Sequence, residues 1–165
     1  MKLDQIAQEL SDKGLCFTSK PILIGGNAME YYGLRKAGAD IDLVICDDDY
    51  QSLARRYPAE RKDLYGDLGV VLWPFEIWRS IALLGYDFFE QDAIEHDALR
   101  VVSLERLLFT RVIARSVEKY NNDLQMLVNF YYDRYRAPSF LAEAETHTAS
   151  YQKHNGAVFG GQYND

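Results

Sequence analysis

The chain has 165 residues, a length typical of a single domain that buries a sizeable core. Hydrophobic residues make up 48% of the chain and aromatic residues 13%, which argues against a disordered protein. The formal net charge of −7 disfavours non-specific binding to nucleic acid, because such binding depends on Lys and Arg neutralising phosphates.

The first predicted element is an N-terminal helix, in which Leu3, Ile6 and Leu10 recur at helical spacing. Its charged residues are not those of a signal peptide, and no later apolar run has the length of a transmembrane span. We therefore expect a cytoplasmic protein with no membrane partner. Cys16 and Cys46 belong to no metal-binding or disulfide pattern, so we expect both to be reduced and buried.

The central part of the chain begins with an apolar strand, Pro21 to Ile24, which Gly25 and Gly26 end. Two glycines allow a sharp turn and let the backbone approach a ligand closely. Asn27 is a candidate N-cap for a short helix over residues 28–32. Because the first N–H groups of a helix have no partner within the helix, this turn is a candidate phosphate site.

A second strand follows, in which Asp40 and Asp42 alternate with Ile41 and Leu43. Positions two apart in a strand share a face, so the two carboxylates are predicted to point the same way. Two adjacent carboxylates repel each other unless a cation lies between them. Oxygen ligands of this kind suit a hard divalent cation, and the neighbouring phosphate site points to nucleotide chemistry.

The next predicted helix, residues 47–56, opens with three aspartates, which we interpret as helix capping in preference to metal binding. An apolar strand at 69–73 and a second strand containing Glu76 follow. Glu76 lies between apolar residues, and an unpaired buried carboxylate is costly. It is therefore either an edge-strand residue facing solvent or a third acid beside the acidic pair, with Asp67 as the alternative third acid.

Three helices are predicted in the remainder of the chain. Ser103 is the expected N-cap of the first, and the second covers about residues 122–135. The third begins at Pro138 and is expected to end near Glu145. The last twenty residues are polar with little periodicity, so we expect a loosely held tail.

The order of Gly25 and Gly26, a spacer and then Asp40-Ile41-Asp42 resembles the signature of the DNA polymerase beta-like nucleotidyltransferase superfamily. The stretch Gly33-Leu34-Arg35 is similar, more narrowly, to small bacterial nucleotidyltransferases related to abortive-infection toxins. The helix after Ser103 and the residues around Lys119 and Asp123 add to the resemblance, which covers roughly residues 22–127.

The resemblance implies a two-metal nucleotidyl transfer site with Mg²⁺ or Mn²⁺ as cofactor. The carboxylates that would act both as metal ligands and as catalytic residues are Asp40, Asp42 and Glu76. The residues that would bind the nucleotide phosphates are Gly25, Gly26, Asn27, Arg35 and Lys119. Arg35 is equally consistent with a surface ion pair, and Lys119 is a candidate through the resemblance alone.

We therefore predict an α/β (α+β) fold, with a small mixed nucleotidyltransferase-like sheet flanked by helices and a helical C-terminal part. Residues 1–100 would form the catalytic core and residues 101–145 the helical part of the same domain. Residues 146–165 would form the loosely ordered tail.

The predicted function is transfer of a nucleoside monophosphate from an NTP to a hydroxyl acceptor, which stays open among a small molecule, a protein and a tRNA. A catalytically weak or inactive nucleotide-binding or partner-binding module is the alternative, supported by Glu76 in place of Asp and by Gly38 in place of a hydroxyl residue. A second alternative is the toxin of a toxin–antitoxin pair, with an antitoxin as partner.

Overall fold

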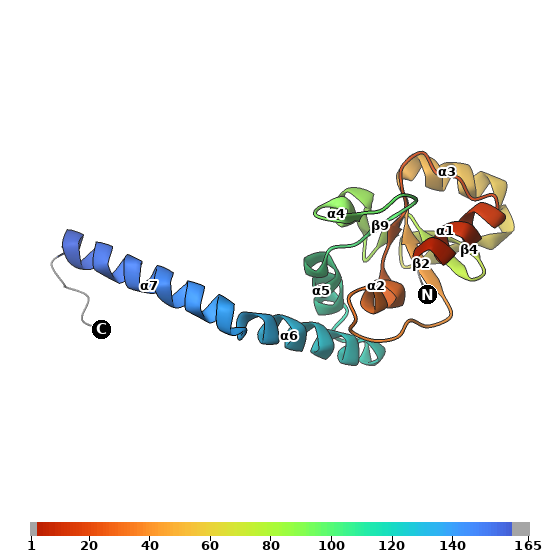
Figure 1. The fold of residues 1–165 in the computed structure, drawn as a ribbon. Coiled ribbons are helices and arrows are strands. Elements are labelled where there is room, and N and C mark those ends of the chain that lie inside the picture. Colours follow the sequence, from red (N-terminus) through yellow and green to blue (C-terminus); the bar gives the residue numbers. More distant parts are fainter. Residues whose placement is uncertain (1–2, 160–165) are drawn as a thin grey trace. The chain divides into compact units, whose positions relative to one another are not determined.

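The computed structural model describes residues 3–159, and Figure 1 shows their course. The chain forms two compact units, Met1–Leu127 and Val128–Asp165. The helices of the first unit are α1 (Leu3–Asp12), α2 (Gly25–Tyr31), α3 (Asp47–Arg56), α4 (Tyr86–Glu90) and α5 (Leu104–Ile113), with 3₁₀ turns at Pro58–Glu60 and Glu118–Tyr120. Helix α6 (Asn121–Tyr135) begins in the first unit and ends in the second, which also contains α7 (Pro138–Phe159).

A mixed sheet forms the centre of the first unit. Its strands are β1 (Ile22–Leu23), β2 (Ile41–Val44), β3 (Arg61–Leu64), β4 (Asp67–Leu72), β5 (Phe75–Trp78), β8 (Ile94–Glu95) and β9 (Arg100–Val101). The strand order is β3-β4-β5-β2-β1-β9-β8, with β1 parallel to β9, β2 parallel to β5 and the other neighbours antiparallel. A separate hairpin contains β6 (Ser80–Ile81) and β7 (Leu84–Gly85). The predicted class, a mixed sheet flanked by helices, is confirmed.

The two faces of the sheet differ in character. In β2, Ile41 and Leu43 are fully buried on one face, while Asp42 between them is only partly buried on the other. Helices α1 and α3 cover the apolar face, as Figure 1 shows. Their contributions to the core are Ile6, Leu10, Tyr50 and Leu53. Burial on one face thus fixes the register that presents polar side chains on the other.

The short helix α2 begins earlier than the sequence predicted. Its N-cap is Ile24, and Asn27 lies inside the helix, so the assignment of Asn27 as N-cap was wrong. Gly25 explains the difference, because its φ of +63° lets the chain turn into the helix directly after β1.

The two cysteines are free, but the prediction that both are buried was wrong. Cys16 is exposed in the segment between α1 and β1. Cys46 is half-buried at the N-cap of α3, where its thiol donates a hydrogen bond to Asp49 over 3.2 Å.

Helix α7 is longer than predicted, because it continues to Phe159 instead of ending near Glu145. Residues 146–159 of the expected loose tail are therefore helical, and residues 160–165 lie outside the described part of the chain. The segment from Ala142 to Thr146 is rich in Ala and Glu, which favour helix without requiring an apolar stripe. Among residues 3–159, no helix is long and apolar enough to cross a membrane.

Candidate functional site

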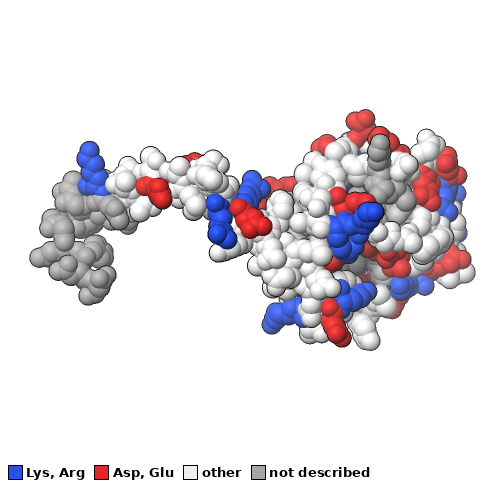
Figure 2. Space-filling view, turned by 60° about the horizontal axis from the view of Figure 1, so that its bottom comes forward, with Lys and Arg blue, Asp and Glu red and all other residues white. Residues whose placement is uncertain are grey.

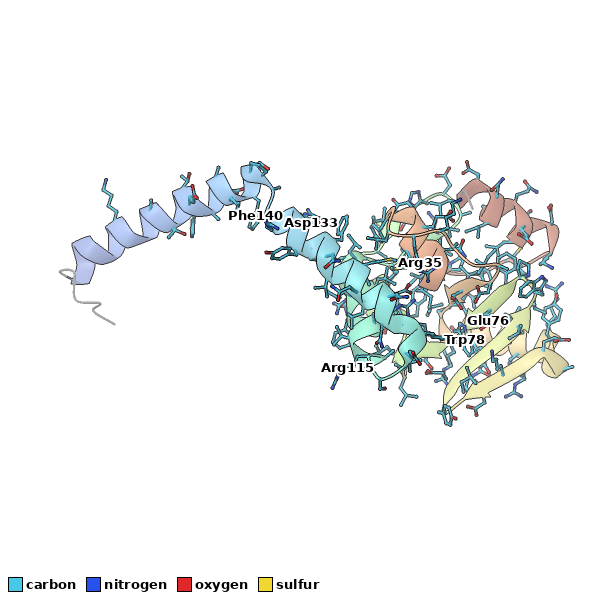
Figure 3. All side chains as sticks on the ribbon, turned by 90° about the horizontal axis from the view of Figure 1, so that it is seen from below. Arg35, Glu76, Trp78, Arg115, Asp133 and Phe140 are labelled. Carbon is cyan, nitrogen blue, oxygen red and sulfur yellow. The ribbon has the colours of Figure 1, made fainter. Side chains whose placement is uncertain are left out.

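A cavity of about 510 Å³ lies in the first unit, beside β2 and β5. The sequence-predicted site residues in its wall are Gly25, Gly26, Arg35, Asp40, Asp42, Glu76 and Lys119. Figure 3 shows that Glu76 and Trp78 come from the sheet, whereas Arg35 comes from the turn after α2. The segments that carry these residues are far apart in the sequence, and the fold brings them to one cavity.

The pairing of β2 with β5 sets the positions of the carboxylates. Asp42 is in register with Glu76 in this parallel pair, so both side chains lie on the cavity face of the sheet. Asp40 lies just before β2 and joins them in the cavity wall. A Cβ on Gly38 would come within 2.8 Å of Asp40 Oδ1, so the glycine leaves room for this carboxylate.

Asp42 has an unusual charge environment. Burial, followed by the charges of Asp40 and Glu76, raises the pKa of Asp42 to about 6. A hydrogen bond from Trp78 and the charge of Arg111 act in the opposite direction but do not cancel the rise. The charges of Asp40 and Glu76 therefore act on the Asp42 carboxylate.

Gly25 allows the backbone to pass directly against Asp42. A Cβ on Gly25 would lie 2.2 Å from Asp42 Oδ2, a distance that no real Cβ contact shows. The positive φ of Gly25 independently disfavours any other residue. The turn predicted as a phosphate site thus lies directly against Asp42, one of the two acids of the pair.

Asn27 is the predicted site residue that the structure does not bring to the cavity wall. It is 4% exposed, and its amide Nδ2 donates to the backbone carbonyl of Asp40 over 2.8 Å. Its Oδ1 is buried, and no described residue donates to it. Asn27 therefore holds the segment that carries Asp40 and does not face the cavity.

Two arginines bind the carboxylate of Asp123 in the same cavity. Arg35 donates to both carboxylate oxygens of Asp123, over 2.6 and 3.0 Å, and Arg111 donates to Oδ2 over 3.1 Å. Burial by itself would raise the pKa of Asp123, but the hydrogen bond from Arg35 and the charge of Arg111 hold it below its usual value. Arg35 thus forms an ion pair, as one of its two interpretations expected, but its partner is buried and not at the surface, and Arg35 also lines the cavity.

Arg111 is a site residue that sequence reasoning missed. It is 9% exposed on α5, and its guanidinium lies 4.5 Å from the centroid of the Tyr120 ring. Lys119 Nζ is 4.7 Å from the same centroid. The available signal was an arginine at a core-facing position of an apolar helix, which requires a partner such as Asp123.

Asp123 holds two arginines in place, so its replacement by Asn is expected to destabilise the fold. Removing one partner of a buried ion pair leaves an uncompensated charge, here on Arg111, and the expected cost is about 3 kcal/mol. Urea denaturation of the variant would measure the loss. Asp133→Asn, at an exposed position of the same helix, is the matched control. Equal midpoints for the two variants would contradict the assigned role.

Asp67, the alternative third acid, has a structural task. Its carboxylate accepts hydrogen bonds from the Ser80 hydroxyl and from the backbone N–H groups of Ala82 and Leu83. These bonds tie the β6–β7 hairpin to β4. Both carboxylate oxygens are thereby engaged, so Glu76 is the better placed third acid.

The charges around the cavity are mixed in sign. Figure 2 shows Lys and Arg side chains beside Asp and Glu side chains on the forward face, without a continuous basic patch. Within residues 3–159, no group of three His, Cys, Asp or Glu side chains is arranged so that it could hold a metal ion. One of the basic side chains forms an ion pair with a cavity carboxylate: the ammonium of Lys62 is 3.5 Å from Glu76 Oε2.

Comparison with known proteins does not assign the chain to a family. No protein-family model matches it, no curated protein sequence is similar to it, and no solved structure matches its fold.

Proposed function

We propose that the chain is a metal-dependent nucleotidyltransferase, which moves a nucleoside monophosphate from an NTP to a hydroxyl acceptor. The observation that carries the proposal is the convergence of the carboxylates of Asp40, Asp42 and Glu76 in one cavity wall with Gly25 and Gly26. Basic side chains of the same cavity supply the positive charge that a triphosphate requires. These are Arg35, Arg111 and Lys119, and Lys62 also lines the cavity.

The three carboxylates suit a divalent cation by the chemistry of their oxygen atoms, although their side chains would have to move closer together to hold one. They present oxygen ligands, and burial beside the charges of Asp40 and Glu76 raises the pKa of Asp42, so a cation at this place would offset unfavourable negative charge. Asp40, Asp42 and Glu76 would hold Mg²⁺ or Mn²⁺. When bound, such a cation lowers the pKa of an acceptor hydroxyl and offsets charge on the leaving pyrophosphate.

The other residues act on the nucleotide. The free backbone N–H groups at the start of α2 would donate to phosphate oxygens, and Arg35 and Lys119 would offset the phosphate charge. The acceptor oxygen forms a bond to the α-phosphorus while the bond between that phosphorus and the bridging oxygen breaks. Pyrophosphate leaves, and the hydroxyl proton passes to solvent.

A second candidate function is binding of a nucleotide without transfer. The supporting observation is the ion pair between Lys62 and Glu76, which engages the third carboxylate with a protein cation. In that case the cavity would bind NTP and change the surface offered to a partner protein.

Pyrophosphate release from labelled NTPs, measured with Mg²⁺ and a broad panel of hydroxyl acceptors, distinguishes the two functions. We expect release by the wild-type chain and loss of at least about a hundredfold in Asp40→Ala and Asp42→Ala, because charge stabilisation is the largest contribution in such sites. Asp97→Ala, at an exposed position outside the cavity, is the control.

Equilibrium binding of a non-hydrolysable NTP, measured in parallel, completes the test. Glu76→Ala is expected to bind the analogue and to transfer slowly. Tight binding that no acceptor converts into transfer would favour the binding module. Absence of binding would remove the nucleotide function altogether.

A further inference from the structure

Lys62 has a position that neither the motif nor the proposed mechanism uses. It lies on the edge strand β3, in register with Gly69 of β4, which is in turn in register with Trp78 of β5. These three positions form one row across the cavity face of the sheet. The hydrogen bond from the Gly66 N–H to the Asp63 side chain closes the β3–β4 turn beside this row.

The row has a glycine where a side chain would prevent the arrangement. A Cβ on Gly69 would lie 2.6 Å from Cε3 of Trp78, so Gly69 leaves room for the indole ring. Lys62 reaches over this ring, with Nζ 5.3 Å from the ring centroid. The indole thus supports the lysine and directs its ammonium towards the carboxylates.

The ammonium ends beside the third carboxylate. Lys62 Nζ is 3.5 Å from Glu76 Oε2, and the side chains are 36% and 27% exposed. Glu76 is itself in register with Asp42, so the lysine supplies positive charge at the edge of the carboxylate cluster. The positive charge of Lys62 repels a divalent cation that approaches the carboxylates. The same charge reduces the repulsion among the carboxylates.

We propose that Lys62 is a positioning residue that competes with the divalent cation for Glu76. In the cation-free protein the tethered ammonium holds Glu76, and cation binding at Asp40 and Asp42 recruits Glu76 only when Lys62 is displaced. This inference rests on the proposed function, because it requires the cation site of Asp40, Asp42 and Glu76. Its consequence is a weaker cation site than three free carboxylates would form.

The test is direct binding of Mn²⁺, followed by electron paramagnetic resonance and calorimetry without nucleotide. Lys62→Met retains the apolar stem on Trp78 and removes the charge, so it is expected to bind Mn²⁺ about three- to tenfold more tightly. Lys62→Arg retains the charge and should stay near the wild-type affinity. Lys13→Met, at an exposed position near the end of α1, controls for loss of one positive charge.

A double variant makes the test specific to Glu76. In a Glu76→Gln background, Lys62→Met should leave Mn²⁺ affinity unchanged, because the group for which the ammonium competes is gone. Equal affinity of wild type and Lys62→Met, or the same gain in both backgrounds, would overturn the role of Lys62. Asp42→Asn distinguishes failure of the Lys62 role from failure of the proposed function. If Asp42→Asn binds Mn²⁺ as well as wild type does, the cation site of the proposed function is contradicted as well.

Discussion

Replacing Asp42 by Asn is expected to abolish nucleotidyl transfer and, at the same time, to stabilise the cation-free protein at neutral pH. Transfer is lost because the variant lacks the central carboxylate of the site. Stability rises because the wild-type protein keeps a charged carboxylate in a buried place beside two other acids, and their charges with burial raise the pKa of Asp42 to about 6.

The direction of the pH dependence follows from proton binding. The folded state binds a proton at Asp42 more tightly than the unfolded state, in which the pKa of this carboxyl is near its ordinary value of 3.8. The free energy of unfolding therefore falls as pH rises from the unfolded to the folded pKa, and the cost is complete above about pH 6. From the pKa difference, the cost is at most about 3 kcal/mol.

Urea denaturation in the presence of a chelator measures this effect as the stability difference between Asp42→Asn and wild type. We expect the variant to be more stable at about pH 7.5 and to lose that advantage at about pH 4. Asp97→Asn, at an exposed position outside the cavity, is the matched control. An Asp42→Asn protein that is less stable than wild type at neutral pH would contradict the assigned environment.

Gly25→Ala should be the most damaging substitution among the glycines of the site. The added Cβ would meet Asp42 Oδ2 at 2.2 Å, and the residue would also have to keep a φ of +63°. The carboxylate and the turn must move apart, so we expect a loss of about 2–4 kcal/mol in the free energy of unfolding. Binding of the NTP analogue should be lost with it.

Gly33→Ala provides the matched control for Gly25→Ala. Gly33 has a similar φ of +72°, but an added Cβ would find no atom within 4 Å. Its cost should be limited to backbone strain, about 1 kcal/mol. The difference between the two variants in urea denaturation isolates the contact with Asp42. Equal losses would show that strain alone explains the effect.

The period-two pattern of the strands predicted that Asp40 and Asp42 share a face, but it left Glu76 open between solvent and the acidic pair until the pairing of β5 with β2 was seen. Asp42 and Glu76 are each flanked by apolar residues, so burial of those neighbours fixes the side on which the carboxylates lie. The mixed α+β class followed from the same alternation of strand and helix patterns. Such patterns can be recognised in the sequence because they depend only on a few adjacent residues.

Features that depend on distant partners could not be predicted in this way. Arg111 and Arg35 are joined only through Asp123, and sequence spacing does not reveal a contact between three separate segments. The role of Asn27 was misassigned because Gly25 begins the helix earlier than a typical N-cap pattern indicates. The length of α7 depends on intrinsic helix propensity, which an amphipathic pattern does not report.

The placement of Trp78 gives the protein an intrinsic optical reporter. The chain has two tryptophans, and Trp73 is 66% exposed, whereas Trp78 is 3% exposed in the cavity wall. The indole of Trp78 donates a hydrogen bond to Asp42 and lies beneath the ammonium of Lys62. Its fluorescence is therefore sensitive to the charges at the carboxylates. In a Trp73→Phe variant, all tryptophan emission comes from Trp78.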